Sequence, residues 1–167
     1  MGALLLMAAL ISGSAAPDVT EDDREAVERL IRAQVGTGRS ADDQPVAALF
    51  DRQHILAGSG ADGVGTLLVA QYTIETGLSW QIYLAVLDKD THTTLACGRI
   101  GGKSYRLVTI RSVSEGMVDL DVMYYAPDDA LCCPSVSGAT TIELRDGQLW
   151  ETNSRLAPRA SRGAAKP

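Results

Sequence analysis

The sequence predicts an α+β domain in which an N-terminal helix packs on a meandering antiparallel sheet, or partial barrel, of about six strands. Two observations lead to this prediction. One amphipathic helix pattern precedes every strand-like run, and the runs that follow are joined by short turns. Short turns force antiparallel pairing, because parallel neighbours need a crossover of about a dozen residues or more. With 167 residues, 46% of them hydrophobic, the chain is long enough for one domain with a single core.

The first segment, residues 1–16, has the pattern of a signal peptide. The apolar run from Leu4 to Ile11 is too short to span a bilayer, which needs about 20 residues. The small residues of Gly13–Ala16 suit a signal peptidase. We therefore expect an exported protein, periplasmic or extracellular. The later sequence contains no apolar run long enough for a membrane span, and we expect none.

A helix is expected from Thr20 to Val35. Thr20 and Asp23 have the spacing of a capping box, in which each side chain binds the other residue's backbone N–H. The apolar residues recur at helical spacing and form one stripe: Val27, Leu30, Ile31 and Val35. The acidic stretch Glu21–Glu28 is expected to be solvated surface.

Residues 39–65 allow two interpretations. The stretch 42–45 has the signals of a short helix start, which would bury Val46, Leu49 and Phe50. The stretch Gln53–Leu56 fits a first strand equally well. The glycine-rich stretch Gly58–Gly65 is expected to be a turn, since it lacks the spacing and the lysine of a phosphate-binding loop.

The strand-like runs begin at Thr66. They are Thr66–Ile74, Ser79–Leu87, His92–Ile100, Tyr105–Val113, Met117–Tyr125, Ala139–Arg145 and Gln148–Thr152. Ser79–Leu87 and Met117–Tyr125 alternate apolar and polar residues, as strands with one buried face do. Asp146-Gly147 is a strong signal for a two-residue hairpin. The expected division is a domain at 17–152 and a disordered basic tail at 153–167.

The charge is unevenly distributed along the chain. The net charge is −6, and every acidic residue lies at or before Glu151. Four basic residues follow it: Arg155, Arg159, Arg162 and Lys166. An acidic body repels phosphates, so we expect no nucleic-acid partner.

The three cysteines allow several states in an oxidising compartment. Cys97 bonded to Cys132 or Cys133 would tie a strand to the loop before the last hairpin. A bond between the adjacent Cys132 and Cys133 is strained and more readily reduced. The third state has neither bond. A thiol or redox protein that uses Cys132 and Cys133 is one hypothesis for the function.

The sequence shows no catalytic constellation, and we expect no cofactor and no metal site. Asp119, Asp121, Asp128 and Asp129 are the carboxylates that could gather a cation. Solvated strand edges and turn caps explain them as well.

The stretch Tyr125–Ser135, which contains Cys-Cys-Pro-Ser, resembles a segment of exported bacterial proteins such as the mycobacterial LppP/LprE-type lipoproteins. The resemblance implies a location in the bacterial envelope or outside the cell, and it implies no reaction. We therefore expect a monomeric, non-enzymatic binding or structural module with an unknown protein or small-molecule partner. An alternative is a protein inhibitor or ligand-binding partner that presents this loop through Tyr125, Asp128, Asp129, Pro134 and Ser135.

Overall fold

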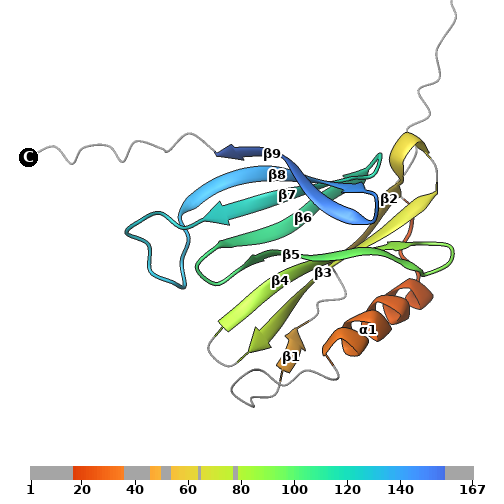
Figure 1. The fold of residues 1–167 in the computed structure, drawn as a ribbon, viewed down its shortest axis with the longest axis horizontal. Helices are drawn as coiled ribbons and strands as arrows, with labels where there is room; N and C mark the ends of the chain where they lie inside the picture. The colour runs from red at the N-terminus through yellow and green to blue at the C-terminus, as the bar shows by residue number, and fades with distance from the viewer. Residues whose placement is uncertain (1–16, 36–45, 50–53, 64, 77–78, 157–167) are drawn as a thin grey trace, which may run out of the picture.

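The computed structural model describes residues 17–35, 46–49, 54–63, 65–76 and 79–156. These ranges contain one helix, a short 3₁₀ turn and a nine-stranded sheet (Figure 1). The helix is α1 (Glu21–Val35), and the 3₁₀ turn is Ala61–Gly63. The strands are β1 (Val46–Leu49), β2 (Ile55–Ser59), β3 (Thr66–Thr76), β4 (Ser79–Asp88), β5 (Thr94–Gly102), β6 (Arg106–Ser114), β7 (Met117–Tyr124), β8 (Val136–Arg145) and β9 (Gln148–Leu156).

All the strand pairs are antiparallel. The strand order is β1-β3-β4-β5-β6-β7-β8-β9, and β2 pairs with the first part of β3. From β3 onward each strand pairs with the next one in sequence, because the short connections allow only neighbouring, antiparallel strands. The predicted α+β class and antiparallel sheet are confirmed.

The sheet is larger than the expected six strands. Seven of the nine strands correspond to the runs predicted from Thr66 onward, and the other two lie within residues 39–65. Val46–Leu49 is strand β1 and not part of a short helix, and β2 begins at Ile55. The expected helix start at 42–45 and Phe50 lie outside the described residues. Both β1 and β2 pair with β3, which is 11 residues long, so long-range pairing decides their conformation.

Gly58 lies inside β2 and not in the turn that its glycine-rich surroundings predict. A Cβ atom at this position would lie 2.1 Å from the carbonyl oxygen of Val113 on β6. Glycine therefore allows β2 to approach the backbone of β6 closely. Next to it, the Ser59 carbonyl oxygen accepts a hydrogen bond from the Gly116 N–H in the β6–β7 turn, at 3.0 Å.

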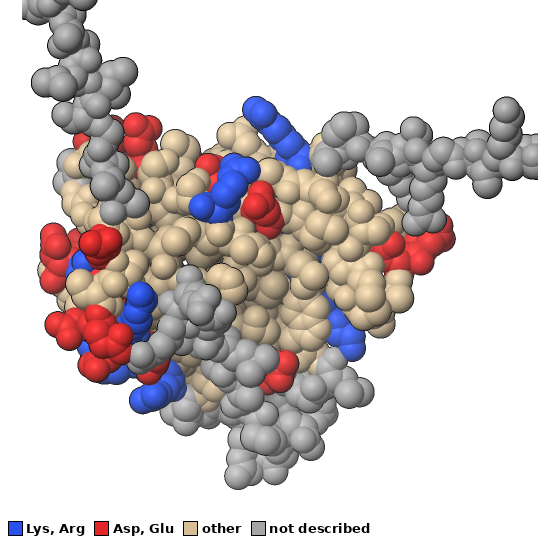
Figure 2. All heavy atoms as spheres, turned by 180° about the vertical axis from the view of Figure 1, so that it is seen from behind, with Lys and Arg blue, Asp and Glu red and all other residues tan. Residues whose placement is uncertain are grey.

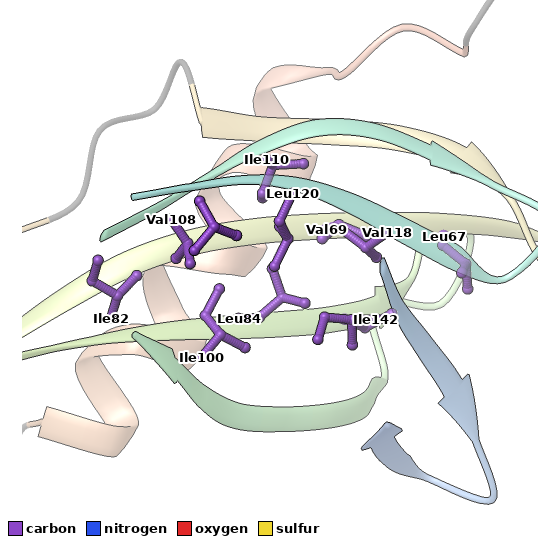
Figure 3. Packing of buried hydrophobic residues seen from close by; sticks show 12 residues of the cluster. Leu67, Val69, Ile82, Leu84, Ile100, Val108, Ile110, Val118, Leu120 and Ile142 are labelled. Atoms are coloured by element: carbon purple, nitrogen blue, oxygen red, sulfur yellow. The ribbon is translucent and has the colours of Figure 1, made fainter. Parts of the chain in front are cut away.

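The sheet folds on itself between β5 and β6. These two strands share the residue pair Gly102–Arg106, whereas β4–β5 and β6–β7 pair over most of their length. Side chains of β3, β4 and β5 meet those of β6, β7 and β8 in one buried cluster (Figure 3). The alternation predicted for two strands is confirmed by the cluster members Ile82, Leu84, Val86, Val118, Leu120 and Val122.

Helix α1 begins at the predicted capping box. The Thr20 N–H donates to Asp23 Oδ2 at 2.8 Å, and the Asp23 N–H donates to Thr20 Oγ1 at 3.2 Å. Val27 and Ile31 are buried and share a second hydrophobic cluster with side chains of β2, β3 and β4. In Figure 1, α1 lies on the side of the molecule that carries β1 and β3, away from β9.

Asp23 departs from the solvated surface expected for Glu21–Glu28, because it is only 1% exposed. Its carboxylate lies 2.9 Å from Lys89 Nζ and 2.8 Å from His92 Nε2, both in the β4–β5 turn. Burial alone would raise the pKa of Asp23, but hydrogen bonds from Thr20, His92 and Lys89 outweigh it and hold that pKa well below its usual range. The start of α1 is thus connected to the sheet by paired charges.

The exposed side of α1 carries ion pairs, namely Arg24–Glu21, Arg29–Glu25 and Arg32–Glu28. Figure 2 shows charged side chains gathered most densely at the left of the visible face, with smaller charged groups in its upper middle and at its right. Within the described ranges, no helix is long and apolar enough to cross a membrane.

Strand β9 continues past its expected end at Thr152. Residues 153–156 belong to the sheet and not to the basic tail. The expected signal peptide at 1–16 and residues 157–167 lie outside the described part of the chain.

We predict that Asp23→Asn lowers the free energy of unfolding by about 3 kcal/mol at pH 7, because Lys89 then stays partly buried without its counter-charge. The matched control is Asp22→Asn in the same turn, where the side chain is exposed and the loss should stay below about 1 kcal/mol.

The folded pKa of Asp23 lies below the unfolded value. Its contribution is therefore complete above about pH 4 and declines as the pH falls further. Urea unfolding at pH 7 and pH 3 measures both effects, and equal losses in the two variants at pH 7 would contradict the prediction.

Candidate functional site

Four strand ends meet at one end of the sheet and line an open pocket of about 770 Å³. The antiparallel register brings them together, because Tyr124 lies opposite both Arg106 and Val136, and Leu156 lies opposite Gly138. We call this site the tyrosine pocket. It is lined by Tyr105, Arg106, Tyr124, Tyr125, Ala126, Pro127, Val136, Glu151, Ser154 and Leu156.

Arg106 forms the floor of the tyrosine pocket. It alternates with Val108 and Ile110 on β6, whose side chains belong to the buried cluster, so the strand directs the arginine inward. The residue is 3% exposed. Its Nε donates to the Ile100 carbonyl oxygen at 2.7 Å, and its two terminal nitrogens each donate to one oxygen of Glu151 at 2.9 Å. This two-bond geometry is the strong form of a carboxylate–guanidinium pair.

Glu151 is surrounded by hydrogen-bond donors. Besides the two bonds from Arg106, its Oε1 accepts bonds from Thr140 Oγ1, at 2.8 Å, and from Ser154 Oγ. The bonds from Arg106 outweigh the effect of burial and lower the pKa of Glu151 to about 2. The carboxylate is therefore charged at neutral pH, and the pair as a whole is neutral.

Three tyrosines surround this pair. The Arg106 guanidinium lies 4.8 Å from the ring centroid of Tyr105, which is 45% exposed. Arg106 Nη1 also donates to the Tyr124 hydroxyl oxygen at 3.5 Å. Among the described residues we find no acceptor for the Tyr124 O–H proton, so this group is a hydrogen-bond donor available to a ligand.

Tyr125 supplies the third ring and belongs to the predicted binding loop. Its hydroxyl donates to the Leu131 carbonyl oxygen at 2.8 Å. Asp129 instead bonds within the loop: its carboxylate accepts from Ala126 N at 2.7 Å, and from Ser135 N and Oγ at 2.8 Å each. The structure thus places Tyr125 at the pocket and Asp129 and Ser135 at the base of the loop. Asp128 and Pro134 are not among the lining residues.

Of the three cysteine states that the sequence leaves open, the structure shows the bond within the loop. Cys132 and Cys133 are joined to each other, and Cys97 has a free thiol. Cys97 Sγ lies 3.1 Å from the Tyr72 hydroxyl oxygen and 3.5 Å from Gln34 Oε1 of α1. β5 therefore presents Cys97 toward α1 and away from the β7–β8 loop. The bonds of Asp129 and Tyr125, and not a bridge to β5, hold the loop.

Three of the four carboxylates considered as cation ligands have other partners: Asp119, Asp121 and Asp129. Asp119 accepts hydrogen bonds from Thr141 Oγ1 at 2.8 Å and Ser112 Oγ at 3.0 Å, and these bonds lower its pKa. Asp121 Oδ1 lies 3.4 Å from Arg111 Nη1. In the described ranges no three His, Cys, Asp or Glu side chains are grouped to hold a metal ion.

Tyr105, Arg106 and Glu151 were not expected as site residues. A signal for Arg106 is present in the sequence, because it shares the strand face of Val108 and Ile110, and an arginine on a buried face needs an acidic partner. Glu151 lies 45 positions away, and no local pattern connects the two residues.

No protein-family model, curated protein or solved structure matches the chain significantly. The geometry of the tyrosine pocket is therefore the main guide to the function.

We predict that Glu151→Ala lowers the free energy of unfolding by about 3 kcal/mol, because it leaves the buried charge of Arg106 without a partner. The matched control is Glu143→Ala on β8, which removes a surface pair with Arg145 and should cost less than about 1 kcal/mol. Urea unfolding at pH 7 measures both losses.

The pH dependence provides a second check. Because the pKa of Glu151 is lowered on folding from 4.5 to about 2, its contribution is complete above about pH 5 and is lost as the pH falls toward 2. The difference between wild type and Glu151→Ala should shrink over that range. A constant difference, or one no larger than that of the control, would contradict the role of Glu151.

Proposed function

We propose that the protein is an exported, non-enzymatic binding module and that the tyrosine pocket is its ligand site. The observation that supports this proposal is the combination of a charge-paired Arg106–Glu151 floor with the rings of Tyr105, Tyr124 and Tyr125. Concave sites with mostly apolar walls and a few directed polar groups are typical of small-molecule binding. In this proposal α1 covers the outer face of β2–β4 and takes no part in binding.

The ligand class follows from the available groups. Arg106 and Glu151 neutralise each other, so an ionic ligand would gain no counter-charge and would lose its hydration. The rings of Tyr124 and Tyr125, with Pro127, Val136 and Leu156, offer apolar and aromatic contacts. The Tyr124 O–H offers one directed donor. We infer a neutral, mainly apolar ligand that carries a hydrogen-bond acceptor.

The same geometry supports binding rather than catalysis. A general acid or base works best when its pKa lies near the operating pH. The pKa of Glu151 is about 2, and its oxygens already accept bonds from Arg106, Thr140 and Ser154. The pocket's carboxylate is therefore poorly suited to proton transfer at neutral pH.

Export remains part of the proposal and is supported by the pattern of residues 1–16 and by the resemblance at Tyr125–Ser135 to exported bacterial proteins. A second candidate function is the binding of a protein partner through this loop. Leu131, which is 57% exposed, favours it. Pull-down from a periplasmic extract with wild type and Leu131→Asp tests this candidate, and identical partner sets would argue against it.

We predict that the protein binds acetophenone, a neutral aromatic ketone, more tightly than benzoate or toluene. Benzoate is anionic, and toluene lacks an acceptor for the Tyr124 O–H. Tyr124→Phe should weaken acetophenone binding by about fivefold to tenfold, the equivalent of one hydrogen bond, and leave toluene binding unchanged. Titration followed by ligand-observed and protein-observed NMR measures the affinities and locates the site.

The control variant is Tyr83→Phe, which removes a hydroxyl bonded to Gln81 on β4. It should bind all three compounds as the wild type does. Absence of acetophenone binding, or equal binding of acetophenone and benzoate, would refute the proposed ligand class.

A further inference from the structure

We propose that the Cys132–Cys133 disulfide is a reversible switch, operated by an external dithiol, that sets the affinity of the tyrosine pocket. The inference rests on the proposed function, because it concerns the regulation of the same pocket. It also extends that function to a thiol–disulfide reaction in which the protein exchanges electrons with a small molecule.

The disulfide is open to attack. Both cysteines are exposed, and the preceding Leu131 is 57% exposed. Their Cα atoms lie 3.8 Å apart, closer than the approximate range of 4.4–6.8 Å in ordinary disulfides. Accessible disulfides with unfavourable backbone spacing are the ones that thiols reduce readily.

The backbone around the disulfide holds the wall of the pocket. Tyr125 lines the pocket, and its hydroxyl donates to the carbonyl oxygen of Leu131, the residue before Cys132. The Cys133 N–H in turn donates to the Ala130 carbonyl oxygen at 2.9 Å. The Leu131 carbonyl group directly precedes the small covalent ring that the disulfide closes, and the Cys133 N–H belongs to that ring. Opening the ring frees these peptide groups to rotate, so the acceptor that fixes the Tyr125 ring is released.

The base of the loop is independent of the disulfide. Asp129 accepts hydrogen bonds from the backbone of Ala126 and Ser135 and so closes the loop without the cysteines. Reduction therefore changes the tip of the loop and the Tyr125 side chain, while the sheet and the Arg106–Glu151 floor keep their structure. This separation makes the change local and reversible.

The reaction balances with a dithiol as the reductant. One thiolate of the dithiol attacks a sulfur of the pair, the S–S bond breaks, and a mixed disulfide forms with one protein thiolate as the leaving group. The second thiol of the reductant resolves the mixed disulfide. The protein gains two electrons and two protons, and the dithiol becomes a cyclic disulfide. The reverse reaction restores the bond.

The test uses the full chain with Cys97→Ser, so that thiol effects come from the pair alone. Acetophenone affinity is measured by NMR titration with the pair oxidised, after reduction by dithiothreitol, and after re-oxidation. We expect a several-fold weaker affinity in the reduced state, because the Tyr125 ring must be ordered on binding, and full recovery on re-oxidation. The double variant Cys132→Ser with Cys133→Ser, made in the same background, should have the acetophenone affinity of the reduced protein. Addition of dithiothreitol should not change that affinity.

The outcomes separate the two proposals. Equal acetophenone affinity in the oxidised and reduced states overturns the switch and leaves the binding function intact. If acetophenone binds neither state, the proposed ligand class is wrong, and the NMR signals of the loop then test the switch. Faster amide exchange at Cys133 and shifted Tyr125 ring signals on reduction would then support the switch, and unchanged signals would overturn it.

Discussion

The buried guanidinium of Arg106 needs a counter-charge, and much of the second part of the sheet is arranged to provide it. An unpaired charge in this position would be strongly destabilising. Glu151 reaches Arg106 because the β8–β9 hairpin places it next to Thr140, which binds the same carboxylate. The pair thus links β6 to β9 across the floor of the tyrosine pocket, beside the Tyr124 hydroxyl.

A second buried charge has the same role at the helix. Asp23 is bound by the backbone of Thr20 and by Lys89 and His92 of the β4–β5 turn. Replacing such buried pairs by apolar residues often leaves stability unchanged. We interpret Arg106–Glu151 and the contacts of Asp23 as groups that fix a single register for the hairpin and a single position for the helix start.

The helix start and the alternating strands could be predicted from the sequence, because residue spacing within each segment determines them. The capping box of Thr20 and Asp23 and the alternating strands around Leu84 and Leu120 follow from spacing alone. β1 and β2 were ambiguous because their conformation comes from pairing with β3. Gly58 shows the same limit: its surroundings resemble a turn, and the close backbone of Val113 is what requires glycine.

The site was less predictable than the fold. Tyr125 was expected in a binding loop because the sequence around it is unusual. Arg106 and Glu151 lie on β6 and β9, and only the pairing of the strands brings them together. The cysteines could be identified as a group, yet their pairing depended on the direction in which β5 presents Cys97. That direction is set by packing against Tyr72 and α1, which no cysteine spacing reveals.

The close contact between β2 and β6 has a consequence for the behaviour of the protein in concentrated solution. Edge strands with free backbone groups are templates for pairing with other chains, and long flat edges promote aggregation. β1 and β2 have only 4 and 5 residues, and the backbone of Ser59 is occupied by Gly116. The glycine that lets β2 meet β6 thus reduces the free backbone at the β1–β2 end of the strand order, whereas β9 forms the other end.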